Sequence, residues 1–266
     1  MRPLSGFSED ARWRVKAVLF DIDDTLTTEG RLTAGAYAAM ERLSGAGLLV
    51  VPITGRPAGW CDHIARMWPV DAVVGENGAF YFRYDHETRA FTKRFQLSPD
   101  ERVENRYRLE ALCDQILESV PGAAVTSDQL YRESDLAIDY CEDVACLPGS
   151  AVRRIIRLFE DAGATAKVSS VHVNGWFGDY DKLSMTRRMM KECFAVDLEA
   201  VKETAVFIGD SPNDAPMFQF FPNAIGVANV RDFKDLLTVE PAYVTEARVG
   251  AGFTEVAEAL LEVKSS

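Results

Sequence analysis

The chain has 266 residues, of which 47% are hydrophobic and 26% charged, and its net charge is −12. These values are typical of a folded globular protein that is long enough for two lobes, and they exclude collagen-like and disordered chains. The negative charge disfavours nucleic acid as a partner, because binding a phosphate backbone requires a surplus of Lys and Arg.

The first 15 residues are polar and lack the apolar core of a secretory signal. No apolar stretch approaches the roughly 20 residues that are needed to cross a bilayer. We therefore expect a cytoplasmic protein without a membrane partner. The five cysteines form no close metal-binding pair, and their odd number does not suggest a disulfide framework. We predict that all five are reduced thiols: Cys61, Cys113, Cys141, Cys146 and Cys193.

The first third of the chain alternates predicted strands and helices. Strands are expected at residues 15–20, 48–53 and 71–75, and helices at 32–46 and 58–67. This alternation is typical of a parallel, doubly wound sheet. A β-hairpin is then predicted from two strand-like runs that flank a polar turn, at residues 80–84 and 90–95.

The middle of the chain has a different pattern. A long charged helix is expected at residues 98–120, with an imperfect apolar stripe that includes Val103 and Tyr107. Further strands are expected at 123–126, 135–140 and 164–173, and a helix at 152–162. Strands with two helices suggest a small α+β layer.

After Gly178 the first pattern returns. Helices are expected from residue 182, from residue 213 and up to residue 263, with strands at 204–208, 224–228 and 242–245. We therefore predict one α/β core, residues 1–84 and 181–266, that is interrupted by an inserted domain at 85–180.

Two carboxylates directly follow the first predicted strand. Asp21 and Asp23 lie two residues apart, so an extended chain would point both to the same side. In open parallel sheets, ligands bind outside the carboxyl ends of the strands. Like charges held this close require a cation or a proton, which favours a magnesium site with one nucleophilic carboxylate and one acid. The alternative is a turn and helix-cap cluster at 21–25, where Asp and Thr are common.

Thr54, Gly55 and Arg56 follow the second predicted strand. A hydroxyl, backbone N–H groups and a helix N-terminus are suited to hold phosphate oxygens. The alternative is a capped turn with an arginine on the surface.

Two further segments carry charged groups to the same predicted edge. Asp210, Asn213 and Asp214 follow the strand at 204–208, and their oxygens are of the kind that Mg²⁺ prefers. Lys182 begins the helix at which the core resumes. Its ammonium would neutralise both an aspartate and a phosphate, although a lone lysine at a helix start is usually solvated.

The order of these motifs, DxDxT at 21–25, TGR at 54–56, a lysine at 182 and GDxxND at 209–214, closely resembles the haloacid dehalogenase-like phosphohydrolases. The resemblance covers residues 15–84 and 181–263. The insertion resembles the type IIB cap of the Cof-like sugar phosphatases. The resemblance implies an α/β fold, with a Rossmann-like parallel-sheet core and an α+β cap. Many members have Gly where this chain has Asp24, which adds negative charge beside the site.

The resemblance also implies a role for each matching position. Asp21 would be the nucleophile that forms an aspartyl-phosphate, and Asp23 would be the general acid and then the general base. Phosphate oxygens would be held by Thr54, Gly55, Arg56, Lys182 and Asn213. Mg²⁺ would be bound by Asp21, Asp23 through its backbone carbonyl, Asp210 and Asp214, the last bracing the site.

The inserted domain is expected to recognise the rest of the substrate. The alternation at 171–174 predicts a strand with one polar face toward the cleft, although a histidine such as His172 is often a surface or satisfied residue. The candidates for specificity are Arg132, Glu133, His172 and Asn174. Trp176 and Phe177 would either stack on a sugar or pack in the core.

We therefore predict a magnesium-dependent phosphatase acting on a small sugar phosphate or related metabolite. Two alternatives stay open. A phosphomannomutase-like phosphotransferase has the same type of cap and the same DxDxTLT opening, found here at 21–27. A non-catalytic binding or regulatory domain would keep the fold but would be expected to lose some of the charged residues of the motifs.

Overall fold

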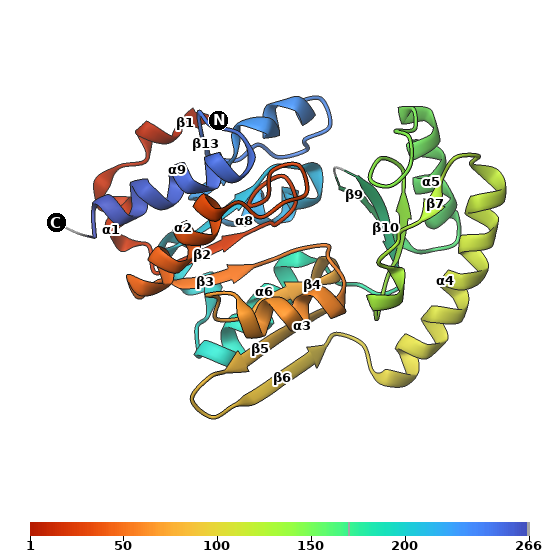
Figure 1. Ribbon diagram of the computed structural model, residues 1–266, viewed down its shortest axis with the longest axis horizontal. Helices are drawn as coiled ribbons and strands as arrows, with labels where there is room; N and C mark the ends of the chain where they lie inside the picture. The colour runs from red at the N-terminus through yellow and green to blue at the C-terminus, as the bar shows by residue number, and fades with distance from the viewer. Residues whose placement is uncertain (170, 265–266) are drawn as a thin grey trace.

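Three β-sheets organise the protein in the computed structural model, which describes residues 1–169 and 171–264. A six-stranded and a three-stranded sheet form the larger part of the molecule, and a four-stranded sheet lies to one side of it (Figure 1). In this view the N-terminus lies at the top of the larger part, beside β1 and β13. Within the described residues, no helix is long and apolar enough to cross a membrane.

The six-stranded sheet is parallel throughout, with the strand order β1-β13-β12-β11-β2-β3. Its strands are β1 (Arg2–Pro3), β2 (Ala17–Phe20), β3 (Leu49–Pro52), β11 (Ala205–Gly209), β12 (Ala224–Gly226) and β13 (Tyr243–Val244). All four residues of β2 are buried, as expected for a strand covered on both faces. The predicted α/β class and parallel sheet are confirmed.

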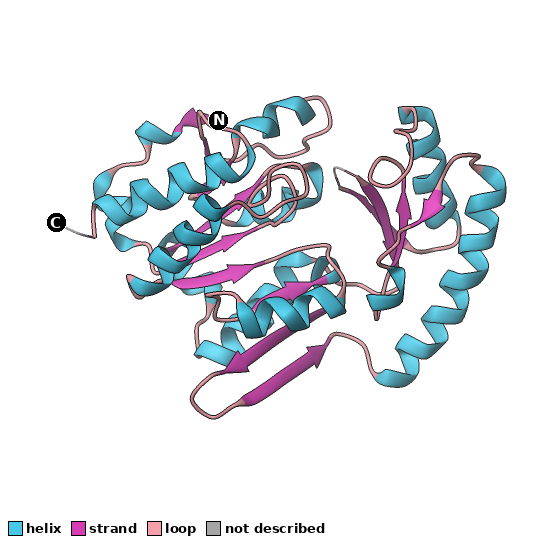
Figure 2. Ribbon diagram, viewed as in Figure 1, coloured by secondary structure: helices cyan, strands magenta, loops and turns pink. Residues whose placement is uncertain are grey.

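Helices cover both faces of this sheet (Figure 2). Val18 and Phe20 of β2 pack in the same apolar cluster as α2 (Ala34–Gly45) and α9 (Val249–Glu262). Their neighbours Ala17 and Leu19 point to the other face, toward α6 (Lys182–Phe194) and α8 (Ala215–Phe220). The sequence pattern did not predict two short helices, α1 (Glu9–Arg14) and α7 (Leu198–Val201).

The three-stranded sheet is antiparallel and contains the predicted hairpin. It consists of β4 (Val73–Gly75), β5 (Phe80–Asp85) and β6 (Ala90–Phe95). A bridge between Ile53 and Val74 joins it to the end of β3, and α3 (Ala58–Met67) packs beside it. β6 thus pairs with core strands although it lies beyond residue 84, and the division at residues 84 and 180 stays a prediction.

The four-stranded sheet, in the order β7-β8-β10-β9, is also antiparallel. It consists of β7 (Ala124–Val125), β8 (Leu136–Asp139), β9 (Thr165–Val168) and β10 (His172–Trp176). α4 (Pro99–Ser119) and α5 (Gly149–Asp161) share an apolar cluster with it. We call this α+β unit, from α4 to β10, the cap.

Two details of the cap differ from the prediction. The strand expected at 164–173 is a pair of strands, because Val173 pairs antiparallel with Val168 and the chain must reverse between them. Residue 170, which comes between these two strands in the sequence, lies outside the described residues. Val103 and Tyr107 do not pack in the cap core but are 55% and 69% exposed, because only the later turns of α4 contact the cap's apolar cluster.

The prediction that all five cysteines are reduced is wrong for two of them. Cys141 and Cys146 form a disulfide, with their Cα atoms 4.1 Å apart. They meet because the loop after β8 folds back, with the backbone N–H of Leu147 donating to the Tyr140 carbonyl at 2.8 Å. This contact depends on a loop conformation that cysteine spacing does not reveal. The other three are free, and Cys61 and Cys113 are buried.

Candidate active site

Three of the motifs meet at one edge of the parallel sheet. Strand β2 lies between β3 and β11, with Phe20 opposite both Pro52 and Ile208. Asp21 therefore emerges beside Asp210, and Thr54 emerges just beyond the end of β3. The predicted edge is the carboxyl edge of three adjacent strands, where ligands bind in such folds.

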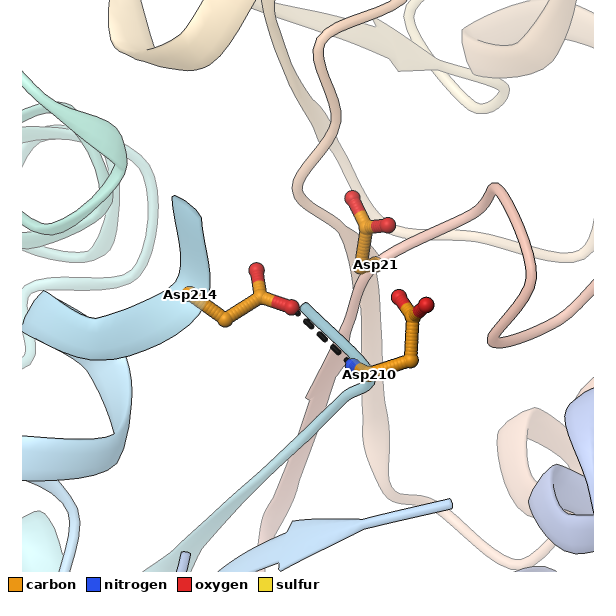
Figure 3. Close-up of side chains that lie close together, drawn as sticks. All are labelled: Asp21, Asp210 and Asp214. Carbon is orange, nitrogen blue, oxygen red and sulfur yellow. Dashed lines mark hydrogen bonds between the residues drawn. The ribbon is translucent and has the colours of Figure 1, made fainter. Parts of the chain in front are cut away.

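Three carboxylates converge at this edge (Figure 3). Asp21, Asp210 and Asp214 are all buried, and each offers one oxygen within 4.8 Å of the others. Asp214 also accepts a hydrogen bond from the backbone N–H of Asp210 at 3.1 Å. This close approach requires Gly209, because a Cβ there would lie 2.4 Å from an Asp214 oxygen.

Burial and repulsion disfavour the charges of this cluster. Burial raises the pKa of Asp21 from 3.8 to about 7; Lys182 opposes this shift, and Asp214 and Asp23 add to it. Burial, and then repulsion from Asp21, also raises the pKa of Asp210 well above its usual range. A buried set of hard oxygen donors with excess negative charge fits a divalent cation such as Mg²⁺.

Lys182 supplies the positive charge inside the cluster. Its Nζ lies 2.8 Å from Asp21 Oδ1 and 2.8 Å from Asp214 Oδ1, and the residue is only 2% exposed. Burial opposes its charge, but the two aspartates outweigh burial and raise the Lys182 pKa. Lys182 therefore stays protonated and holds both carboxylates in place.

The start of α6 places this lysine. Asp181 caps the helix, and its carboxylate accepts the backbone N–H of Ser184 at 2.7 Å. Gly78, in the turn after β4, packs directly on this start: its φ is +105°, and a Cβ there would lie 2.0 Å from the Asp181 carbonyl oxygen. Only glycine accommodates both the backbone conformation and the contact.

Asp23 does not share the environment of Asp21. The chain turns at 22–26, with the N–H groups of Leu26 and Thr27 donating to the Ile22 carbonyl, so the two carboxylates have different partners. Arg56 holds Asp23 through Nε at 2.9 Å and Nη2 at 2.8 Å. Arg56, which was predicted to hold a phosphate oxygen, is thus the partner of Asp23, the second aspartate of the first motif.

The remaining core candidates are close to these groups. Thr54 is buried, and its Oγ1 accepts the backbone N–H of Arg56 at 3.0 Å. Asn213 is held by Ser211, whose hydroxyl donates to Asn213 Oδ1 at 2.7 Å. Both residues are therefore fixed by local hydrogen bonds.

A small cavity of about 20 Å³ lies where the core and the cap meet. The core contributes Asp21, Asp23, Gly55, Arg56 and Asn213, and the cap contributes Arg132, Ser169, Val171, His172 and Asn174. Three of the four cap candidates therefore line the same cavity as the two motif aspartates. The carboxylate of Glu133 instead pairs with Arg102 at 2.9 Å on the outside of the cap.

The cap residues of this cavity are held by hydrogen bonds of their own. Arg132 Nη1 reaches across to the core and donates to the Gly55 carbonyl at 3.0 Å. The Asn174 amide donates to Asp135 at 3.0 Å. Trp176 and Phe177 are buried in apolar clusters, so their role is packing.

Two acidic residues that the sequence did not single out connect core and cap. Glu76 is fully buried and accepts the backbone N–H groups of Ala58, Glu133 and Ser134 at 3.0, 2.9 and 2.7 Å. Burial, and then repulsion from Asp135, raises its pKa to about 8. The sequence pattern assigned no role to Glu76, and its only signal is an acid that directly follows the strand predicted at 71–75.

Glu142 is the second of these residues. Its carboxylate lies 2.9 Å from Arg56 Nη2 and 2.7 Å from His172 Nε2. Glu142 stands in the loop that the disulfide closes. An acid in a loop carries no signal of such a contact, so the sequence alone could not have found it.

The family model of the haloacid dehalogenase-like hydrolases matches residues 15–221 of this chain. The chain belongs to this family of hydrolases. The predicted family, fold class and enzymatic nature are thereby confirmed. A comparison with curated proteins finds no match.

Solved structures with this fold are similar over nearly the whole chain. A protein from Thermoplasma acidophilum has a TM-score of 0.70 at 17% identity, covering 94% of this chain and 99% of its own. A subclass IIB sugar phosphatase has a TM-score of 0.63 at 14% identity, and the match covers 94% of this chain and 100% of the phosphatase. The sucrose-phosphatase of Synechocystis, in complex with sucrose and phosphate, has a TM-score of 0.63 at 14% identity, with 92% and 97% covered. At these identities the likeness shows the fold alone.

Proposed function

We propose that this hydrolase is a magnesium-dependent phosphatase that cleaves a small phosphomonoester through an aspartyl-phosphate. The observation that carries the proposal is the buried contact of Asp21 with Lys182, beside Asp210 and Asp214 at the end of β2. The similar structures of a sugar phosphatase and a sucrose-phosphatase support a sugar phosphate as the substrate.

Asp21 is the proposed nucleophile. One of its oxygens attacks phosphorus, and the bond from phosphorus to the leaving oxygen breaks. Lys182, 2.8 Å from Asp21 Oδ1, favours the ionised carboxylate. The same ammonium attracts the oxygens of the incoming phosphoryl group, so that two anions can approach each other.

Asp23 is the proposed proton carrier. It gives a proton to the leaving alkoxide, and then takes a proton from the water that hydrolyses the aspartyl-phosphate. Its bidentate contact with Arg56 fixes the position of its carboxylate. This division of roles agrees with the different partners of the two aspartates.

The phosphoryl oxygens are proposed to contact Thr54, the backbone of Gly55, Lys182 and Asn213, whereas Arg56 positions Asp23. Asp21, Asp210, Asp214 and the backbone carbonyl of Asp23 would hold Mg²⁺, and the buried carboxylates fit this cation. When bound, the cation supplies charge that neutralises phosphoryl oxygens in the transition state. The protein's part is to hold the carboxylates in place through Lys182 and the Asp210 backbone.

The cap must move for a substrate to enter. A cavity of about 20 Å³ is large enough for about one water molecule but not for a sugar phosphate. We therefore propose that the cap moves away from the core to admit substrate and returns to exclude water during phosphoryl transfer.

The test is phosphate release from a panel of phosphorylated sugars, nucleotides and glycerate derivatives, with Mg²⁺ and with a chelator. We expect release with at least one small phosphomonoester and loss of release with the chelator. A parallel assay follows mannose 1-phosphate and mannose 6-phosphate. Isomerisation without net phosphate release would refute the phosphatase and favour a phosphotransferase.

A further inference from the structure

Three side chains that line the cavity are able to carry positive charge: Arg56, Arg132 and His172. These groups would have to bind any second anionic group of a substrate, such as a carboxylate on its leaving group. Lys182 is not available for this purpose, because it is buried between Asp21 and Asp214. The partners of the three cationic groups therefore decide which substrates fit.

Arg132 already has its full set of partners. Its guanidinium contacts Asp128 at 3.0 Å and Asp135 at 3.1 Å, and it donates to the Gly55 carbonyl at 3.0 Å. The side chain is fully buried. Two carboxylates thus outnumber the one guanidinium, with no positive charge left for a ligand.

Glu142 contacts both of the other side chains, Arg56 and His172. It lies 2.9 Å from Arg56 Nη2 and 2.7 Å from His172 Nε2, while Asp23 takes the remaining side of Arg56. Hydrogen bonding to His172, and then contact with Arg56, lowers the pKa of Glu142 to about 2. Glu142 is therefore a fixed negative charge at neutral pH.

The loop that carries Glu142 holds it in this position. The Asp139 carboxylate accepts the backbone N–H groups of Cys141, Glu142 and Asp143, at 2.9, 2.8 and 2.8 Å. The disulfide closes the same loop. The Glu142 backbone is thus anchored from both sides, which favours a defined position for its carboxylate over a freely moving one.

We propose that Glu142 is a specificity-determining residue that restricts the leaving group to a neutral polyhydroxyl compound. A carboxylate on the leaving group would have to displace Glu142 from Arg56 and His172, and it would meet Glu142 as a like charge. Hydroxyl groups meet no such repulsion, and the polar groups of His172 and Asn174 are suited to hydrogen-bond them. Among the described residues of the lining, each cationic group already has an acidic partner.

This inference rests on the proposed phosphatase function, and one matched pair of substrates tests it. Sorbitol 6-phosphate and 6-phosphogluconate have the same open six-carbon chain and differ only in a hydroxymethyl group or a carboxylate at C1. The ratio of their kcat/KM values is measured at pH 7 with Mg²⁺. Both compounds are also measured as competitors of 4-nitrophenyl phosphate hydrolysis, so that a ratio of inhibition constants is obtained whether or not they are turned over.

We expect the protein to prefer the neutral compound by about tenfold or more. Glu142→Gln removes the charge at nearly constant shape and should reduce this ratio by about tenfold, mainly through a lower KM or inhibition constant for 6-phosphogluconate. Glu142→Ala, which removes the contacts of this side chain with Arg56 and His172, should reduce it further. Asp143→Asn is the matched control, because Asp143 lies in the same loop but contacts Ser127, and its ratio should not change.

Three results would overturn the role of Glu142: a preference for 6-phosphogluconate in the unmodified protein, an unchanged ratio in both Glu142 variants, or an equal change in Asp143→Asn. The proposed phosphatase function fails in a different way. Absence of phosphate release from every phosphomonoester, 4-nitrophenyl phosphate included, would refute that function and with it this inference.

Discussion

The two ends of the cavity differ in how their charges are balanced. At the core end, three buried carboxylates converge with Lys182 as their cation, and the pKa of Asp21 is raised to about 7. At the cap end, each cationic group already has a carboxylate partner, and the pKa of Glu142 is lowered to about 2. At the core end, the clustered carboxylates favour binding of a cation. At the cap end, the basic side chains Arg56 and Arg132 are already paired with acids, which disfavours binding of a further anion.

The largest expected effect is at the core end. Asp21→Asn removes the proposed nucleophile and should lower kcat for phosphate release by about 10³-fold or more. The matched control is Asp24→Asn in the same loop, where φ is +55°, a conformation that Asn tolerates well. Its kcat should stay within about threefold. Equal loss in both variants would contradict a special role for Asp21.

The excess of negative charge at the core end also predicts that Mg²⁺ stabilises the folded protein. A cation that binds the folded state alone should raise the free energy of unfolding by about 2.7 kcal/mol at 100 times its Kd. Urea unfolding with Mg²⁺ and with a chelator measures this gain. Asp210→Asn should reduce the gain, because it removes one carboxylate of the cluster. A gain of the same size in Asp210→Asn would count against this site.

Substitution of Glu76 tests how much its hydrogen bonds between core and cap contribute to stability. Glu76→Gln places an amide N–H₂ beside a backbone N–H that the carboxylate now accepts, such as that of Ser134. An unpaired buried donor should lower the free energy of unfolding by about 1–3 kcal/mol when unfolding is measured near pH 9, above the Glu76 pKa of about 8. Glu118→Gln on the exposed side of α4 is the control, with an expected change within about 0.5 kcal/mol. Equal stability of the Glu76 variant and the unmodified protein would contradict the role of this carboxylate in joining core and cap.

The smallest effect is the pH dependence that Glu142 contributes. Its pKa is lowered from 4.5 to about 2, so its stabilisation is present above about pH 4.5 and is lost as the pH falls toward 2. Because solvent screens a partly exposed pair, Glu142→Gln should lower the free energy of unfolding at pH 7 by only about 0.5–1 kcal/mol. The difference from the unmodified protein should shrink in urea unfolding below pH 4.5. A difference that grows there would contradict the assigned shift.

The residues that meet at the core end could be predicted from the sequence, because in a parallel sheet each of them is placed by the strand that it directly follows. Each motif directly follows a buried apolar strand, and adjacent strands bring their carboxyl ends together. The pattern thus predicted that Asp21, Thr54 and Asp210 would meet. It did not predict that Asp23 would pair with Arg56, because that contact depends on the turn at 22–26.

The cap end could be predicted only in part. His172 and Asn174 were expected on a polar strand face, and Arg132 as a candidate beside them, and all three line the cavity. Glu133 was expected with them, but its carboxylate lies on the outer side with Arg102. The prediction fails for Glu133 because residues 131–134 form no regular strand. Side chains alternate between two faces only in a strand, so the pattern could not tell which of these residues face the cavity.

The sequence by itself determined the family, the parallel core, the inserted cap and which polar residues stand at the strand ends. These depend on short-range patterns: an apolar strand, the polar residues that follow it, and the order of such units. Only the tertiary structure decided the contacts of Glu76 and Glu142 and the pairing of Cys141 with Cys146. Those contacts join loops whose path is set by packing between the cap and the core, and no local pattern encodes that path.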